Sequence, residues 1–158
     1  MSNPLEIGQL APSFSACDRH EQSFTLEDFS KSWLVLYFYP KDNTPGCTTE
    51  AKEFSEYLPE FEALGAKIVG MSPDLEKTHG RFIDKHDLKI TLLCDRDHKI
   101  AESYGVWGLK KFMGKEYMGI IRSTFLISPD QNIAHIWKKV RVKGHVYNVL
   151  EKIKELST

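Results

Sequence analysis

Apolar residues along this chain fall into runs with the spacing of strands, separated by segments with the spacing of helices. Residues 33–39 are continuously apolar and rich in strand-favouring types, which predicts a strand buried on both faces of a sheet. Residues 129–132 form a strong turn signal between two further strand-like segments, which indicates a hairpin. The other segments expected to form strands are 11–17, as an edge strand, 67–72, 91–93, 122–128 and 133–140.

The segments between these strands carry apolar residues at three- and four-residue steps, as amphipathic helices do. In the longest, from about residue 47 to 64, Ala51, Phe54 and Phe61 share one face. Pro59 lies inside this helix and is expected to kink it, because proline removes a backbone donor. The other predicted helices are 25–28, with a capping-box pattern, 75–86, started by Ser72 or Asp74, 98–104 and 145–156.

Strands that alternate with helices, followed by a hairpin and a closing helix, predict an α/β fold. Its central sheet is expected to be mixed, with helices on both faces. The chain has 158 residues, of which 41% are hydrophobic and 27% are charged. This composition fits an ordinary globular protein, and the length predicts a single domain over residues 1–158.

Charge and cysteine content narrow the classes of function. The net charge is −1, which argues against nucleic acid as the main partner, and no apolar stretch approaches the roughly 20 residues of a membrane span. Residues 1–6 lack the basic and apolar regions of a secretory signal. The three cysteines, Cys17, Cys47 and Cys94, form no Cys-x-x-Cys pair, and their odd number argues against a disulfide scaffold. We therefore expect the reducing cytoplasm as the compartment.

The strongest candidate for chemistry is Cys47, which lies between the buried strand 33–39 and the helix that follows. A thiol in the first turn of a helix faces unpaired backbone N–H groups and the positive end of the helix dipole. Both favour the thiolate, which is the nucleophilic form of cysteine. The position also lies beyond the carboxyl end of a strand, where α/β sheets bind their ligands. The alternative is a buried structural thiol, but a Pro-Gly turn before Cys47 and polar residues after it favour a reactive one.

The residues around Cys47 resemble a known family. Pro40, Thr44 and Cys47 match the Pro-x-x-x-Thr-x-x-Cys signature of peroxiredoxins, and the longer Thr-Pro-Gly-Cys-Thr-x-Glu is similar to the bacterioferritin-comigratory, or peroxiredoxin Q, subfamily. Three later segments also match, namely 105–108, 112–115 and 122–127.

The resemblance implies a thioredoxin-like fold and a thiol peroxidase for antioxidant defence. Such an enzyme reduces hydrogen peroxide and organic hydroperoxides through a sulfenic acid on Cys47, without a metal or other cofactor. Thioredoxin, glutaredoxin or a small thiol would restore the thiol, and the subfamily is often monomeric.

Four further residues are candidates for this site, and each has a structural alternative. Arg122 opens an apolar strand, so it either pairs with a thiolate and a peroxide oxygen or faces solvent; the resemblance favours pairing. Glu50 is either the carboxylate that orients Arg122 or a first-turn acid. Thr44 either hydrogen-bonds the thiolate or caps the helix, and Pro40 either ends the strand or shields the thiolate.

Other chemistries fit the sequence less well. A cysteine phosphatase loop needs an arginine at the position of Glu53, and a thioredoxin-type exchange site needs a second cysteine where Thr44 or Glu50 stands. Zinc ligation lacks the short paired spacings that such sites use; its candidate ligands are His79, His86, Cys94 and His98. A Cys–His hydrolase stays an alternative, although no histidine lies in a recognisable motif. A second alternative is a redox-sensing module that uses Cys47 without catalytic turnover.

This chain departs from the subfamily pattern in its resolving cysteine, the second thiol that forms a disulfide with the reactive one. Many members carry it five residues after the reactive cysteine, where this chain has Lys52. The candidates that remain are Cys94, which follows a predicted strand, and Cys17. If the strand of Cys94 is two places from the strand 33–39, the sites are roughly 10 Å apart, beyond the reach of a disulfide without local unfolding. The sequence therefore favours a one-cysteine cycle completed by an external thiol.

Overall fold

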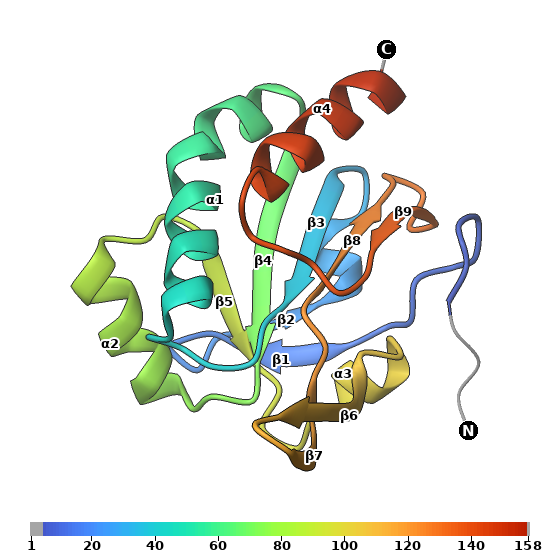
Figure 1. The fold of residues 1–158 in the computed structure, drawn as a ribbon. Coiled ribbons are helices and arrows are strands. Elements are labelled where there is room, and N and C mark those ends of the chain that lie inside the picture. Colours follow the sequence, from blue (N-terminus) through green and yellow to red (C-terminus); the bar gives the residue numbers. More distant parts are fainter. Residues whose placement is uncertain (1–4, 158) are drawn as a thin grey trace.

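The computed structural model describes residues 5–157 and places four α-helices around a central seven-stranded sheet (Figure 1). The sheet order is β2-β1-β5-β4-β3-β8-β9. Its strands are β1 (Ser15–Cys17), β2 (Ser23–Thr25), β3 (Trp33–Phe38), β4 (Ala66–Ser72), β5 (Thr91–Cys94), β8 (Ser123–Ile127) and β9 (Ile133–Trp137). Strands β6 (Trp107–Phe112) and β7 (Lys115–Ile120) form a separate hairpin. The helices are α1 (Pro45–Ala63), α2 (Glu76–His86), α3 (Lys99–Ser103), α4 (His145–Ser157) and the short 3₁₀ helix η1 (Leu26–Phe29).

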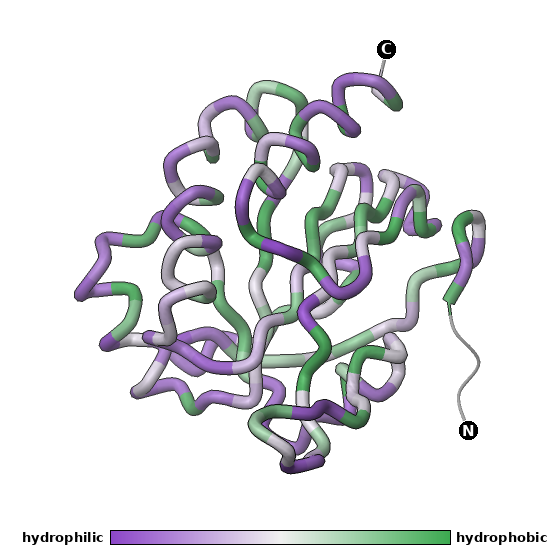
Figure 2. The backbone as a smooth tube through the Cα atoms, viewed as in Figure 1, coloured by the Kyte–Doolittle hydropathy of each residue, from purple (hydrophilic) through white to green (hydrophobic). Residues whose placement is uncertain are grey.

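The sheet is mixed, as predicted. Strands β3, β4 and β5 run parallel, whereas β8 pairs antiparallel with the other edge of β3. Helices α1, α2 and α4 cover one face, and η1 and α3 contribute to the core on the other (Figure 1). Figure 2 shows apolar segments concentrated in the central strands and hydrophilic ones on the outer turns of the helices. The α/β fold with helices on both faces of a mixed sheet is therefore confirmed.

Strand β3 occupies the centre of the sheet. Its side chains alternate between two hydrophobic clusters: Leu36 and Phe38 belong to one, and Val35 and Tyr37 to the other. All four are fully buried. The prediction that this run is buried on both faces is confirmed, and β3 is a rigid support for the loop that follows it.

Two predictions about strands need correction. The segment 11–17 forms only the three-residue strand β1, which lies between β2 and β5 and is not an edge strand. The true edge, β2, is also three residues long and too short to show a period. The hairpin β6–β7 was not predicted, because most of its residues lie at the surface and carry no buried alternation.

The helices match their predicted ranges except at their starts. Helix α1 begins at Pro45 with Thr44 in the N-cap position, and it continues through Pro59 as one helix. Helix α2 begins after Leu75, because Ser72 and Asp74 hydrogen-bond each other instead of capping it. The predicted capping box of Thr25 is present at η1.

Residues 1–4, on which part of the signal-peptide prediction and the domain boundary rest, lie outside the described residues. Within residues 5–157, none of the helices combines the length and the apolar character that crossing a lipid bilayer requires.

Candidate active site around Cys47

Cys47 lies in the first turn of α1, directly after the loop that leaves the carboxyl end of β3. Pro45 occupies a first-turn position, where its missing N–H costs no helical hydrogen bond. The Cys47 residue is only 1% exposed. The helix-start position of this thiol is the one that the sequence predicted, whereas its near-complete burial was not predicted.

Arg122 reaches Cys47 from the opposite side of the site. It directly precedes β8, and the β3–β8 register pairs Phe38 with Ser123, so the start of β8 lies beside the end of β3. The Arg122 Nη2 atom donates a hydrogen bond to Cys47 Sγ at 3.2 Å. A Cβ atom at Gly46 would stand 3.2 Å from the same Nη2, so this glycine leaves room for the guanidinium. The sheet thus joins residues that are far apart in sequence.

Glu50 holds the other arm of the same guanidinium. Arg122 Nη1 donates to Glu50 Oε1 at 2.7 Å, and the Glu50 side chain has no exposed surface. Glu50 Oε2 is buried and has no hydrogen-bond partner within the described part of the chain. Burial raises the pKa of Glu50 to about 7, although the positive charge of Arg122 opposes this shift. The Glu50 carboxylate therefore holds one arm of the Arg122 guanidinium.

Thr44 and Pro40 also lie at the site. Thr44 is the N-cap of α1 by position, but its hydroxyl donates to the Lys41 carbonyl at 2.9 Å and makes no cap hydrogen bond. Its oxygen lone pairs can still accept a hydrogen bond. Pro40 is half-buried and lines a surface pocket together with Arg122 and residues of the β6–β7 hairpin. This pocket is the approach by which a small molecule can reach the guanidinium.

Two residues near the site were missed by sequence reasoning. Lys110 of β6 donates from Nζ to the Ile120 carbonyl at 2.8 Å; burial and Arg122 lower its pKa, and the Cys47 sulfur opposes this shift. His145 pairs through Nε2 with the Thr124 hydroxyl at 2.8 Å, and burial, assisted by Arg122, lowers its pKa to about 4. His145 is therefore neutral at neutral pH. A lysine in an unpredicted hairpin and a histidine at a helix start carry no signal in the sequence.

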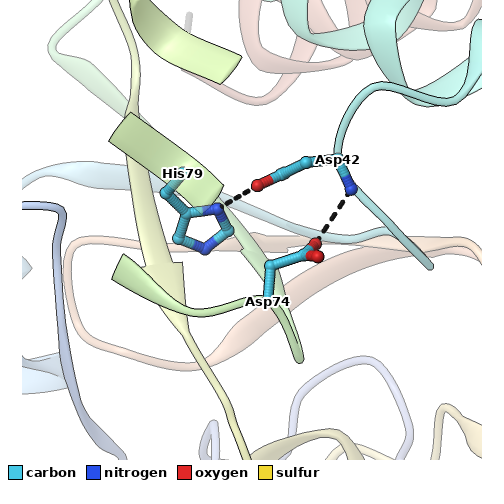
Figure 3. Close-up of side chains that lie close together, drawn as sticks. All are labelled: Asp42, Asp74 and His79. Atoms are coloured by element: carbon cyan, nitrogen blue, oxygen red, sulfur yellow. Dashed lines mark hydrogen bonds and ion pairs between the residues drawn. The ribbon is translucent and has the colours of Figure 1, made fainter. Parts of the chain in front are cut away.

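A buried network fixes the loop that carries Pro40 and Thr44 (Figure 3). The Asp42 carboxylate accepts hydrogen bonds from His79 Nδ1 and from the Tyr39 hydroxyl, each at 2.6 Å. The Asp42 N–H donates to Asp74 at 2.9 Å. Burial lowers the pKa of His79, but Asp42 and the sulfur of Cys94 raise it more strongly, to about 10. An imidazolium–carboxylate pair therefore ties the loop to α2.

The zinc alternative is not supported by this arrangement. His79 uses its two ring nitrogens on Asp42 and the Leu93 carbonyl. Among residues 5–157, Asp42, Asp74 and His79 are the group close enough to share an ion, and their atoms already hydrogen-bond one another and Ser72. The candidate set of His79, His86, Cys94 and His98, which the sequence already disfavoured, does not form a group close enough to share an ion among residues 5–157.

The other cysteines lie elsewhere in the sheet. Cys94 ends β5, which is separated from β3 by β4, so the two-place separation that the sequence analysis assumed is the one observed. Cys17 ends β1, one strand farther away. Lys52, which occupies the common resolving position, is exposed on α1. Spacing across the sheet therefore separates both thiols from the strand that leads to Cys47 by roughly 10 Å or more.

Comparisons with known proteins agree with this site. Residues 7–136 match the AhpC/TSA family. The chain is 49% identical over 153 residues to peroxiredoxin Bcp of Bacillus subtilis, covering 97% of this chain and 98% of that protein. Peroxiredoxin Q of Xanthomonas campestris superposes with a TM-score of 0.87 at 41% identity, covering 92% of each chain.

A further solved structure carries information on activity. The bacterioferritin comigratory protein of Xanthomonas campestris superposes with a TM-score of 0.87 at 40% identity over 92% of each chain. It was solved in trapped intermediate and ligand complexes that concern its alkyl peroxide reduction activity. The fold, the site and these relatives agree, and the chain therefore belongs to the AhpC/TSA family, among its bacterioferritin-comigratory peroxiredoxins.

Proposed function

We propose that this chain is a thiol peroxidase that reduces hydrogen peroxide and organic hydroperoxides, with Cys47 as the nucleophile. The observation that carries the proposal is the 3.2 Å hydrogen bond from Arg122 to Cys47 Sγ at the start of α1. A guanidinium stays charged at every relevant pH, so it stabilises a thiolate and also a developing oxyanion. The alkyl peroxide reduction of the Xanthomonas campestris relative is consistent with the same reaction here.

The reaction follows from these contacts. The Cys47 thiolate attacks the terminal oxygen of the peroxide, the O–O bond breaks, and a sulfenic acid forms on Cys47. The second oxygen leaves as hydroxide or alkoxide and takes up a proton from solvent, which gives water or an alcohol. Arg122 stabilises the negative charge as it moves from sulfur to the leaving oxygen, while Glu50 keeps the guanidinium in place. We infer that the Thr44 oxygen accepts a hydrogen bond from the hydroperoxide proton.

Access to Cys47 differs for the peroxide and for the reducing thiol. With Cys47 only 1% exposed, a small hydroperoxide can enter beside Pro40 and Arg122, but a protein thiol cannot contact the sulfur directly. Reduction of the sulfenic acid by a protein therefore needs the first turn of α1 to open. We infer that a small thiol or thioredoxin completes the cycle, with thioredoxin as the favoured protein reductant. Three expectations from the sequence stay predictions: a single domain, a monomeric state and a cytoplasmic location.

The test is steady-state consumption of hydrogen peroxide with dithiothreitol as the thiol. Cys47→Ser should reduce the rate to that of the uncatalysed reaction, while circular dichroism shows that the variant is folded. The matched control is Cys94→Ser, which removes a buried thiol outside the site and should keep turnover. Substantial peroxide consumption by folded Cys47→Ser would sink the assignment. A single equivalent consumed by the unmodified protein, without further turnover, would favour a redox sensor instead.

A further inference from the structure

Cys17 and Cys94 face each other across two neighbouring strands. The β1–β5 ladder is antiparallel, and its register pairs Cys17 with Cys94. Directly opposed residues in such a ladder have Cα atoms about 4.5–5.5 Å apart, with side chains on the same face. A disulfide spans Cα atoms about 4.4–6.8 Å apart. The backbone therefore already holds both free thiols within bonding range.

Packing shows that the two thiols share one face of the sheet. The chain neighbours Ala16 and Leu93 point into the hydrophobic cluster on the other face, so Cys17 and Cys94 point away from it. Both cysteines line one surface pocket, which also includes Glu76 and Arg96. Cys17 is half-buried and Cys94 is 8% exposed, so Cys17 is the more accessible thiol.

Charged side chains lie close to Cys94. Its side chain lies close enough to the His79 imidazole to raise the pKa of that ring, together with Asp42 and against the effect of burial. Arg96 lines the same pocket as Cys94, and Glu76 and, to a smaller extent, Cys94 raise its pKa. Three acidic residues, Glu76, Asp95 and Asp97, line the same pocket as the two cysteines.

We propose that Cys17 and Cys94 are a second redox site, a cross-strand dithiol that small-molecule disulfides convert to an intramolecular disulfide. The thiolate of the accessible Cys17 attacks one sulfur of the small disulfide, its S–S bond breaks, and one small thiolate leaves. The Cys94 thiolate then attacks the Cys17 sulfur and expels the second small thiolate. The two protons of the protein thiols end on the two small thiols, so the protein loses two electrons and the small disulfide gains them.

The bond would change the stability of the sheet edge. The Cys17–Cys94 pair is the ladder contact that joins β1 to β5, and β1 in turn carries β2. A covalent link there fixes the β1–β2 hairpin to the central strands. It also closes a long loop between distant positions of the chain, which stabilises the folded state by restricting the unfolded one. Oxidation should therefore raise Tm by several degrees.

The experiment uses Cys47→Ser protein, so that the result is independent of the proposed peroxidase. The folded protein is treated with oxidised glutathione and mapped by mass spectrometry without reduction. We expect a linked Cys17–Cys94 peptide pair, a mass loss of two hydrogens, and reversal by dithiothreitol. The Cys47→Ser/Cys94→Ser variant should instead accumulate one glutathione on Cys17, because the resolving thiol is absent. Cys47→Ala replaces Cys47→Ser if the serine variant is not folded.

Two results would overturn the proposal. One is a stable glutathione adduct on Cys17 in protein that keeps Cys94, because the neighbouring thiol would then not resolve it. The other is no reaction of either thiol in the folded protein under conditions that oxidise both in urea. A Cys17–Cys94 disulfide that leaves Tm unchanged would contradict the structural consequence, that the bond strengthens the attachment of β1.

Discussion

Arg122 divides its guanidinium between two acceptors, Cys47 Sγ and Glu50 Oε1. The Glu50 carboxylate is buried, and burial raises its pKa to about 7 even with Arg122 beside it. The contact to Glu50 orients the guanidinium, so that Nη2 points at the sulfur. The rate of Cys47 oxidation should therefore depend on the charge and the fixed position of Arg122 more than on the size of its side chain.

Replacement of Arg122 by methionine should slow oxidation of Cys47 by at least tenfold. Loss of one preorganised charge stabiliser typically costs about 10²–10³ in rate. The measurement is stopped-flow oxidation by hydrogen peroxide, together with the rate of alkylation by iodoacetamide at neutral pH. Arg81→Met, at an exposed position of α2, is the matched control and should leave both rates unchanged. Unchanged rates in Arg122→Met would return Arg122 to a structural role.

At the scale of single residues, the sequence predicted part of the site. Cys47 could be found because its position after a buried strand and in a first turn is a local pattern. Arg122 and Glu50 were candidates, but the contact between them depends on the β3–β8 register, which no local pattern specifies. Lys110 could not be found, because its position near Cys47 depends on a hairpin whose exposed residues show no periodicity.

At the scale of elements, the loop between β3 and α1 depends on the buried pair of Asp42 and His79. Both side chains have no exposed surface, and their atoms are 2.6 Å apart. The pair connects the loop to α2, while the Asp42 N–H connects it to Asp74. Because Cys47 follows this loop directly, the pair also sets where the first turn of α1 begins.

Asp42→Asn should destabilise the protein by about 3–5 kcal/mol at neutral pH, because it leaves a buried imidazolium without its counter-charge. The folded protein raises the pKa of His79 from 6.5 to about 10, so the stabilisation is fully present below the unfolded value. This stabilisation is lost as pH rises through about 10, the pKa of His79 in the folded protein. Urea unfolding at about pH 6, 8 and 10.5 should therefore show a difference between the two proteins that shrinks at the highest pH.

The exposed Asp130→Asn serves as the control for this substitution and should change stability little at any pH. A difference between Asp42→Asn and the unmodified protein that stays constant from about pH 6 to 10.5 would show that shape, and not ionisation of His79, explains the loss.

The elements themselves were largely predictable. The longer strands and helices show clear periods, and their ranges agree with the structure to within a few residues. Strands β1 and β2 have three residues each, too few for a period to identify. The start of α2 could not be assigned, because Ser72 and Asp74 have N-cap chemistry but use it within the Asp42 network.

At the scale of the whole molecule, the sheet order separates Cys47 from the other two cysteines. Cys47 lies beyond β3, Cys94 ends β5 two places away, and Cys17 ends β1 beside it. A disulfide to Cys47 would require the first turn of α1 to unwind and the sulfur to cross β4. The sequence predicted strands that end at or just before Cys17 and Cys94, but the direct pairing of these two residues depends on the strand order, which no local pattern specifies.

A Cys17→Ser/Cys94→Ser variant should therefore still turn over hydrogen peroxide with an external thiol. In the unmodified protein, the Cys47 sulfenic acid should persist long enough for dimedone to trap it. A sulfenic acid without a partner is open to further oxidation to sulfinic acid. Excess peroxide should thus inactivate the enzyme progressively, with a mass gain on the Cys47 peptide that dithiothreitol does not reverse.

A matched substitution tests the reason for this persistence. Lys52 is exposed on α1, five residues after Cys47, where the family resemblance leads us to expect a resolving thiol. Lys52→Cys should supply a partner when the first turns of α1 unwind, and it should protect Cys47 against inactivation by excess peroxide. Lys52→Ser is the control and should give no protection. The decisive measurement is a peptide map without reduction after one equivalent of peroxide. A dominant Cys47–Cys94 or Cys47–Cys17 disulfide in the unmodified protein would overturn the one-cysteine cycle while leaving the peroxidase proposal intact, because the sulfenic acid must form before either bond.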